Sequence, residues 1–220
     1  MIDKLIERTN SKTFFGNGRF HLTELKGQIG HFNTMEFNFI IDEEDNLGNL
    51  VNVEHWRIIS HQTLKYNGIF TVSYLPYIKL NILSEHPLLW AFTKNTLQCE
   101  LKGYPKNPSE FIGDLHFEYE KLTGNWIPLN HVFYNLKENF QKNKKMNFSI
   151  QEPMKEIIEM VSQKHGIEFK VNKVIEGYNK GYSNRPNAKL LIFGNEKVCP
   201  NNFNLRQPYI IADEFIANRK

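Results

Sequence analysis

Residues 34–42, with the sequence TMEFNFIID, alternate between apolar and polar side chains over most of their length. One face of this stretch carries the apolar side chains of Met35, Phe37, Phe39 and Ile41. Because successive side chains of a strand point to opposite faces, the alternation predicts a strand that is buried on one side only. Such a strand is typical of an antiparallel sheet with one covered face.

The pattern continues on both sides of this strand. The polar stretch at 42–48, DEEDNLG, predicts a turn, and residues 50–60 predict a second strand. The apolar phase of the second strand slips partway along, which predicts a β-bulge near Glu54 and His55. Further strands are expected at 69–74, 77–83 and 97–101, so the first hundred residues predict an antiparallel meander.

The clearest helix signal begins at Asn107. Asn107 suits the N-cap position, Pro108 the first helical position and Glu110 the third, and Gly124 follows the apolar residues that recur at helical spacing. We also expect a short helix at 84–93, capped by Ser84, and a third helix at 130–140.

The charged tetrapeptide at 142–145, KNKK, is the one stretch that suggests a boundary. After it the pattern predicts a strand at 146–150, a helix at 152–165, strands at 167–175 and 188–193, and a last strand or strand-to-helix piece at 209–215. The expected fold class is therefore α+β: a β-rich antiparallel N-terminal portion with packed helices, 1–145, followed by a smaller α+β portion, 146–220, packed against it.

Composition narrows the function classes. The chain has 27 basic and 24 acidic residues, and this small surplus does not predict a nucleic-acid-binding protein. It has two cysteines, no signal-peptide pattern at its start and no apolar run long enough to span a membrane. We therefore expect a cytoplasmic protein with no membrane association.

The segment at 14–21, FFGNGRFH, contains two glycines separated by one asparagine. It lacks the third glycine of a dinucleotide-binding loop and the Lys-Ser/Thr pair of a Walker loop. We interpret Gly16 and Gly18 as residues of a tight turn that starts a sheet, with positive φ. Arg19 beside them remains a candidate anion-binding residue.

No cluster in the sequence predicts a metal site or a cofactor. The acids at 42–45 do not have the spacing of a calcium loop, and we interpret them as a solvated hairpin tip. Three E-x-K triplets, beginning at Glu24, Glu100 and Glu168, resemble the spacing of a magnesium-dependent nuclease. Any strand with a polar outer face produces the same triplet, so the nuclease is kept as an alternative function.

The loop at 177–186, GYNKGYSNRP, interleaves aromatic and basic side chains. Its candidate binding residues are Tyr178, Lys180, Tyr182 and Arg185. Such a loop suits a protein interface, and it would also suit stacked bases and phosphates. The small net charge favours a protein partner.

These observations lead to two functional hypotheses, and the sequence does not decide whether the protein is an enzyme. The first is a non-enzymatic protein–protein interaction module, for example a bacterial immunity-type protein that binds a toxin through shape and charge complementarity. The second is a protein that acts on nucleic acid, with the E-x-K carboxylates holding a metal ion. The partner and the oligomeric state are not predicted.

Overall fold

The computed structural model describes residues 2–28, 33–68, 74–76, 79–133, 136, 145–177, 185–194 and 208–220. These residues form three antiparallel sheets and several helices, which confirms the expected α+β class. The chain divides into two compact units: Met1–Glu85 together with Asn187–Lys220 (unit 1), and His86–Pro186 (unit 2).

These units are bounded differently from the two portions expected from the sequence, 1–145 and 146–220. Lys145 lies inside unit 2, where it begins β8 (Lys145–Gln151), and β8 pairs along its length with β7 (Thr96–Lys102). The last three strands of the chain belong to unit 1. The charged residues at 142–145 suggested a boundary, but they carry no information on the pairing of β8 with β7.

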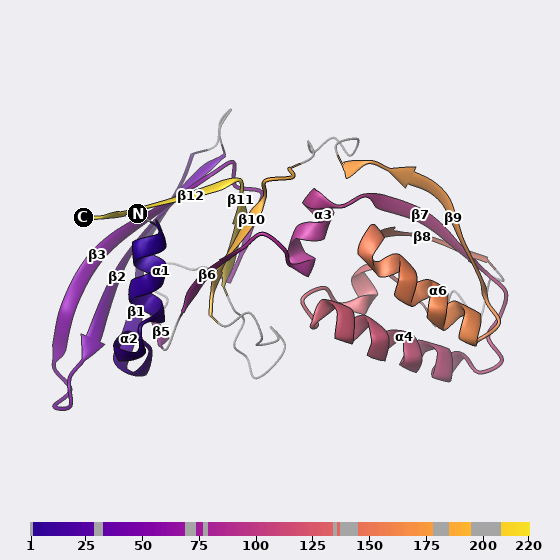
Figure 1. Cartoon of the computed structure of the whole chain (residues 1–220), viewed down its shortest axis with the longest axis horizontal. Coiled ribbons are helices and arrows are strands. Elements are labelled where there is room, and N and C mark those ends of the chain that lie inside the picture. Colours follow the sequence, from indigo (N-terminus) through magenta and orange to yellow (C-terminus); the bar gives the residue numbers. More distant parts are fainter. Residues whose placement is uncertain are drawn as a thin grey trace. The chain divides into compact units, whose positions relative to one another are not determined.

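Unit 1 contains a five-stranded sheet, sheet A, with the order β12-β3-β2-β1-β5 (Figure 1). Its strands are β1 (Gly18–Gln28), β2 (Thr34–Glu44), β3 (Leu50–His61), β5 (Tyr74–Pro76) and β12 (Glu214–Arg219). The strands expected at 34–42 and 50–60 are confirmed as β2 and β3. Phe37, Phe39 and Ile41 are fully buried, so the alternating face of β2 is the core face.

The bulge of β3 lies slightly before its expected position. Ile41 pairs with Glu54, and Glu43 pairs with Val51. Between these two pairs β3 advances by three residues while β2 advances by two. The extra residue therefore falls at Asn52 or Val53, and Asn52 has a φ of 52°. Asparagine tolerates this left-handed conformation better than most residues.

The second sheet of unit 1, sheet B, has the order β4-β11-β10-β6. Its strands are β4 (Lys65–Asn67), β6 (Leu80–Leu83), β10 (Lys189–Phe193) and β11 (Tyr209–Ala212). The buried strand expected at 188–193 is confirmed as β10. The stretch expected at 209–215 forms β11 and the start of β12, which are separated by a bend at Asp213. Of the strands expected at 69–74 and 77–83, residues 69–73, 77 and 78 lie outside the described residues.

Two helices precede sheet A: α1 (Ile2–Asn10) and α2 (Lys12–Asn17). Ile2, Leu5, Ile6 and Thr9 recur at helical spacing, which places them on one face of α1. Leu5 and Thr9 are completely buried, and Leu5 joins the core formed by the inner faces of the sheets. The helix α1 thus anchors the start of the chain to the sheet core.

Gly18 follows α2 directly and starts β1, as expected, but its conformation is not the expected one. Its φ is −79° and its ψ is 144°, which is ordinary extended backbone. A Cβ atom at Gly18 would lie 2.4 Å from the carbonyl oxygen of Phe14 and 2.6 Å from two of its ring atoms. Glycine is therefore required at position 18 because α2 turns closely onto the strand, and not because φ is positive.

Unit 2 is built on a three-stranded sheet, sheet C, with the order β8-β7-β9, where β9 is Glu168–Ile175. Two helices, α4 (Pro108–Thr123) and α6 (Lys155–Lys164), lie on one face of the sheet (Figure 1). Cys99 of β7 lies in the hydrophobic core of this unit, and burial raises the pKa of its thiol to about 11.

The helix signal at Asn107 is confirmed in detail. The Asn107 side chain accepts a hydrogen bond from the Glu110 amide, and Gly124 ends α4 in a left-handed conformation. The helix expected at 84–93 is present as a 3₁₀ turn, η1 (Pro87–Leu89), followed by α3 (Trp90–Thr93). Its cap is His86, whose Nδ1 atom accepts from the Leu88 amide, and not Ser84.

Of the helix expected at 130–140, the structure shows a 3₁₀ turn, η2 (Leu129–His131), and a helical residue at 136. Residues 134, 135 and 137–140 lie outside the described part of the chain. Within the described residues, no helix combines the length and the apolar character that a membrane crossing needs.

Candidate functional site: the β2–β3 hairpin

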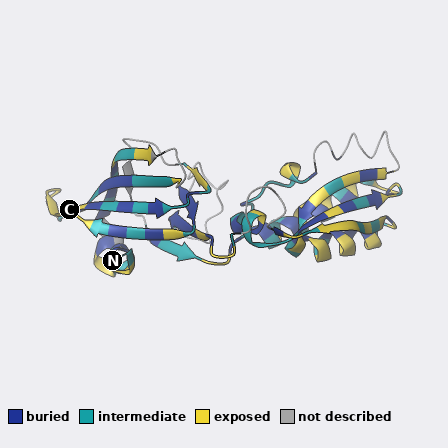
Figure 2. Cartoon of the chain, turned by 90° about the horizontal axis from the view of Figure 1, so that it is seen from above, coloured by how far each residue is buried: buried dark blue, intermediate teal, exposed yellow. Residues whose placement is uncertain are grey.

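The hairpin of β2 and β3 carries the main group of exposed apolar side chains in unit 1. Its turn and the first residues of β3 expose Leu47, Leu50, Val51 and Val53, and the exposed fraction of Leu47 reaches 86%. Figure 2 shows the exposed colour at the far end of this hairpin. Single exposed apolar residues are common on protein surfaces, but four of them gathered at the turn of one hairpin make a candidate contact surface. We call these four residues the apolar tip.

The turn that carries the apolar tip is fixed by one side chain. Asp45 accepts hydrogen bonds from the backbone amides of Leu47 and Asn49, each at 2.8 Å, and from the Asn49 side chain at 3.0 Å. These bonds hold the pKa of Asp45 below its usual value, with the Asn49 side chain as the largest cause. Gly48 takes a φ of 83°, which favours glycine there. The tip is therefore a defined turn.

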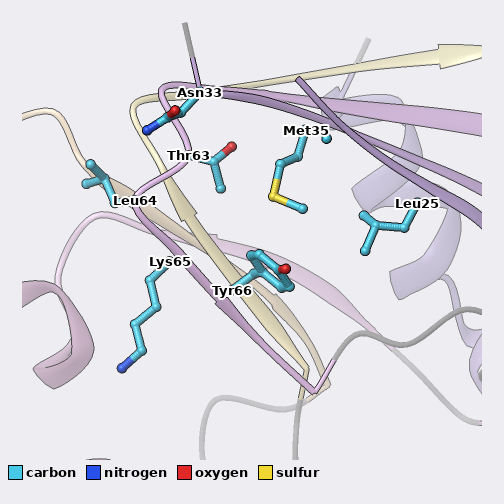
Figure 3. Close-up of a pocket in the computed structure, with 8 residues that line it drawn as sticks. Leu25, Asn33, Met35, Thr63, Leu64, Lys65 and Tyr66 are labelled. Atoms are coloured by element: carbon cyan, nitrogen blue, oxygen red, sulfur yellow. The ribbon is translucent and has the colours of Figure 1, made fainter. Parts of the chain in front are cut away.

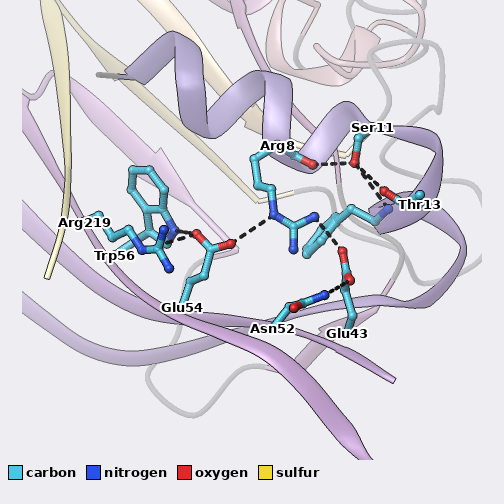
Figure 4. A network of polar contacts seen from close by, with 9 residues as sticks. Arg8, Ser11, Thr13, Glu43, Asn52, Glu54, Trp56 and Arg219 are labelled. Carbon is cyan, nitrogen blue, oxygen red and sulfur yellow. Dashed lines mark hydrogen bonds and ion pairs between the residues drawn. The ribbon is translucent and has the colours of Figure 1, made fainter. Parts of the chain in front are cut away.

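An arginine from α1 braces the inner side of the hairpin (Figure 4). Arg8 donates to Glu54 of β3 at 3.0 Å and to Glu43 of β2 at 2.5 Å. Both carboxylates are only 11–12% exposed, so the charges of this network are largely removed from water. Trp56 and Asn52 add one hydrogen bond each, from Trp56 Nε1 to Glu54 and from the Asn52 amide to Glu43.

The pKa of Glu43 reflects the hydrogen bonds of this network. Burial alone would raise its pKa, but the hydrogen bonds from Asn52 and Arg8 outweigh burial and hold the pKa below its usual value. Asn52 reaches Glu43 from the bulged part of β3. The bulge and its left-handed Asn52 are thus part of the brace.

A second arginine braces the outer side of the hairpin. Arg19 of β1 pairs with Asp42 at 2.8 Å and with Glu44 at 2.9 Å, and His21 lies 3.0 Å from the other Asp42 oxygen. Because Asp42 and Glu43 are neighbours in one strand, their side chains point to opposite faces. The hairpin is therefore held by arginines on both faces.

This arrangement corrects the expectation that the acids at 42–45 form a solvated tip. Asp42 is buried and Glu43 largely so, whereas Asp45 is half-buried and Glu44 is exposed. Arg19, expected as a candidate anion-binding residue, is placed between two carboxylates of its own chain. From the neighbouring strand β1, Arg19 stabilises the hairpin through these two ion pairs.

The aromatic and basic loop at 177–186 is described only in part. Tyr178, Lys180 and Tyr182 lie outside the described residues. Arg185 is described: its backbone amide donates to the carbonyl oxygen of Phe92 at 3.3 Å, within unit 2. Arg19 belongs to unit 1, so the two described residues of the expected site fall in different units.

Two of the E-x-K triplets lie opposite each other in sheet C. Glu100 of β7 pairs in register with Lys170 of β9, and Lys102 pairs with Glu168. Glu100 also contacts the Lys145 ammonium at 2.5 Å, which is the largest cause that lowers the pKa of this carboxylate. In the triplet of β1, Glu24 and Lys26 pair with each other at 2.8 Å. Among the described residues, no three His, Cys, Asp or Glu side chains are clustered as a metal site would require.

A histidine–carboxylate pair joins the two helices of unit 2. His165 Nε2 lies 2.6 Å from Asp114 Oδ2, and Lys164 contacts the same oxygen at 2.7 Å. Among the described residues, no hydroxyl or thiol forms a hydrogen bond with the His165 side chain. Without such a nucleophile, the pair is best explained as a clamp between α4 and the end of α6.

Comparison with known proteins gives no match to a family model, a curated protein or a solved structure. The side chains of the hairpin therefore carry the functional argument. Sequence reasoning missed Arg8 and the apolar tip. The helical spacing at 2–9 could have revealed α1, and the apolar residues around Gly48, in NLGNLVNV, could have revealed the tip.

Proposed function

We propose that the protein is a protein–protein interaction module that binds its partner through the apolar tip of the β2–β3 hairpin. The observation that carries the proposal is the group of four exposed apolar side chains on a turn that is braced on both faces by arginine–carboxylate pairs. A rigid apolar element loses little conformational entropy when a partner covers it, which favours binding.

The charges around the tip favour a particular kind of partner. Glu44 lies exposed and Asp45 half-buried beside the apolar side chains. We therefore propose a partner with an apolar recess and basic groups at its rim, since such a surface matches the tip in both respects. The immunity-type protein that binds a toxin, expected from the sequence, is one biological form of this proposal.

The test is affinity capture from the native host with three forms of the tagged protein. The first is the unchanged protein, the second carries Leu47→Asp and Leu50→Asp, and the third carries Val174→Asp. Val174 is an exposed apolar residue of unit 2 and serves as the matched control.

We expect one stoichiometric protein that stays bound at high salt to the unchanged and control forms and is lost from the hairpin variant. A partner retained equally by all three forms would place the interface elsewhere. Nucleic acid held only at low salt, with no protein partner, would favour the alternative function, because phosphate contacts weaken with salt.

A further inference from the structure

Unit 1 contains a pocket that the proposed interaction does not use. It has a volume of about 600 Å³ and lies between the β1–β2 pair and β4 (Figure 3). This size is within the range of about 300–1,000 Å³ that is common for small-molecule sites. All the residues that line the pocket belong to unit 1, so the pocket lies within one compact unit.

One wall of the pocket is apolar and lies on two strands of sheet A. Leu25 and Met35 line it and also pack against the core of unit 1. Gly27 pairs directly with Met35, so both residues face the same side of sheet A. A Cβ atom at Gly27 would have no neighbour within 4 Å, so the glycine leaves this wall open.

Three polar groups around the pocket can donate hydrogen bonds. The Asn33 amide, the Tyr66 hydroxyl and the Lys65 ammonium lie around it, and none of them forms a hydrogen bond or ion pair with another described residue. Lys65 lies at the rim with its ammonium directed away from Met35 and Leu25 (Figure 3). The described lining contains one cation and no acid.

We propose that this pocket binds an apolar monocarboxylate, such as a medium-chain fatty acid. Its chain would lie against Leu25, Met35 and the Tyr66 ring, where burial of apolar surface stabilises binding. Its carboxylate would remain at the mouth, where the Asn33 amide and the Tyr66 hydroxyl can donate hydrogen bonds. The Lys65 ammonium, which points away from the pocket in this structure, would have to rotate about its side-chain bonds to reach the carboxylate. The proposal is independent of the hairpin interaction.

The first experiment observes the pocket directly. The protein has five methionines, so methionine-methyl-labelled protein gives five NMR signals, and the Met35→Leu variant assigns that of Met35. Sodium decanoate, below its micelle concentration, is expected to shift the Met35 signal saturably and to leave Met146, Met154 and Met160 of unit 2 unchanged. No saturable shift of Met35, or equal shifts of all the signals, would overturn the proposal.

Two further probes test the carboxylate. Methyl decanoate has the same chain without the charge, and decylammonium carries the opposite charge. We expect both to bind at least about tenfold more weakly than decanoate, which corresponds to about 1.4 kcal/mol. Equal binding of the ester would show that the site takes an uncharged acyl chain, and equal binding of decylammonium would show that charge has no role; either result overturns the carboxylate assignment.

Variants test the walls and the rim. Gly27→Leu fills the open wall and is expected to weaken decanoate binding at least about tenfold, whereas Gly27→Ala is expected to keep it within about threefold. Lys65→Glu is expected to weaken binding about tenfold, and Lys4→Glu, the same charge change on the exposed side of α1, is expected to leave it unchanged. Circular dichroism checks that each variant is folded. A folded Gly27→Leu protein that binds as the unchanged protein does would overturn the location of the site.

Discussion

Arg8 and Glu54 are 46 residues apart in the sequence, and their side chains are joined by a hydrogen-bonded ion pair of 3.0 Å. The same guanidinium also binds Glu43, so one side chain of α1 connects both strands of the β2–β3 hairpin. The helix that anchors the start of the chain is thereby also the support of the apolar tip. Stability of the hairpin and binding through the tip should depend on the same arginine.

We expect Arg8→Ala to destabilise the hairpin by about 2–3 kcal/mol. Removing one partner of a buried pair leaves an uncompensated charge, which costs about 3–5 kcal/mol when burial is complete. Arg8 itself is 24% exposed, so water screens part of this cost. Native-state hydrogen exchange at the amides of β2 and β3 measures the loss.

The matched control for Arg8 is Lys121→Ala. Lys121 forms an exposed pair with Glu118 on α4, and exposed pairs of this kind contribute less than about 1 kcal/mol. If Arg8→Ala altered exchange in the hairpin no more than Lys121→Ala alters exchange in α4, the brace would have no energetic role.

Gly18→Ala is expected to destabilise unit 1 by at least about 2 kcal/mol. The added methyl group would overlap the Phe14 carbonyl oxygen at 2.4 Å and its ring at 2.6 Å, so α2 or β1 would have to move. Gly27→Ala, where the methyl group meets nothing, should be neutral or stabilising by up to about 1 kcal/mol. Thermal unfolding of the two variants compares them, and equal melting temperatures would contradict the close-approach explanation.

The sequence predicted those parts of the fold that local patterns determine. The alternation in β2 and the cap residues around α4 each depend on neighbouring residues only, and both predictions are confirmed. The division of the chain depends on β10, β11 and β12 returning to pair with strands far earlier in the sequence. No local pattern encodes such long-range pairing.

The candidate site was predicted in fragments. The turn at 42–48 was expected, but its acids were interpreted as solvated because their partners, Arg8 and Arg19, lie more than 20 residues away. An acidic run looks the same in sequence whether water or arginine neutralises it. The distinction requires the register of β1 with β2 and the position of α1.

The clamp of unit 2 should depend on pH with a defined sign. Lys164 and then His165 hold the pKa of Asp114 below its usual value of 3.8. A group whose pKa is lower in the folded state stabilises the fold above its unfolded pKa, and this contribution is lost as the pH falls through the folded value. Asp114→Asn should therefore be less stable than the unchanged protein at pH 7, and the difference should shrink as the pH falls below 3.8. A difference that persists in acid would show that the ionised carboxylate is not what stabilises the clamp.

The facing E-x-K triplets lead to a prediction about metal binding. The carboxylates of Glu100 and Glu168 each lie beside a lysine ammonium, at 2.5 Å from Lys145 and 3.4 Å from Lys102 respectively. An ammonium at that distance disfavours a divalent cation at the same carboxylate through like-charge repulsion. We expect millimolar Mg²⁺ to leave the melting temperature unchanged, since only a ligand that binds the folded state raises it.

The matched pair of variants for this prediction is Glu100→Gln and Glu168→Gln. Glu100 is 12% exposed and Glu168 is 60% exposed, so the first change should lower the melting temperature more than the second, as expected for carboxylates that pair with lysines. A Mg²⁺-dependent rise in the melting temperature that either variant abolishes would contradict this explanation. It would restore the triplets as a metal site and make nuclease activity the next measurement.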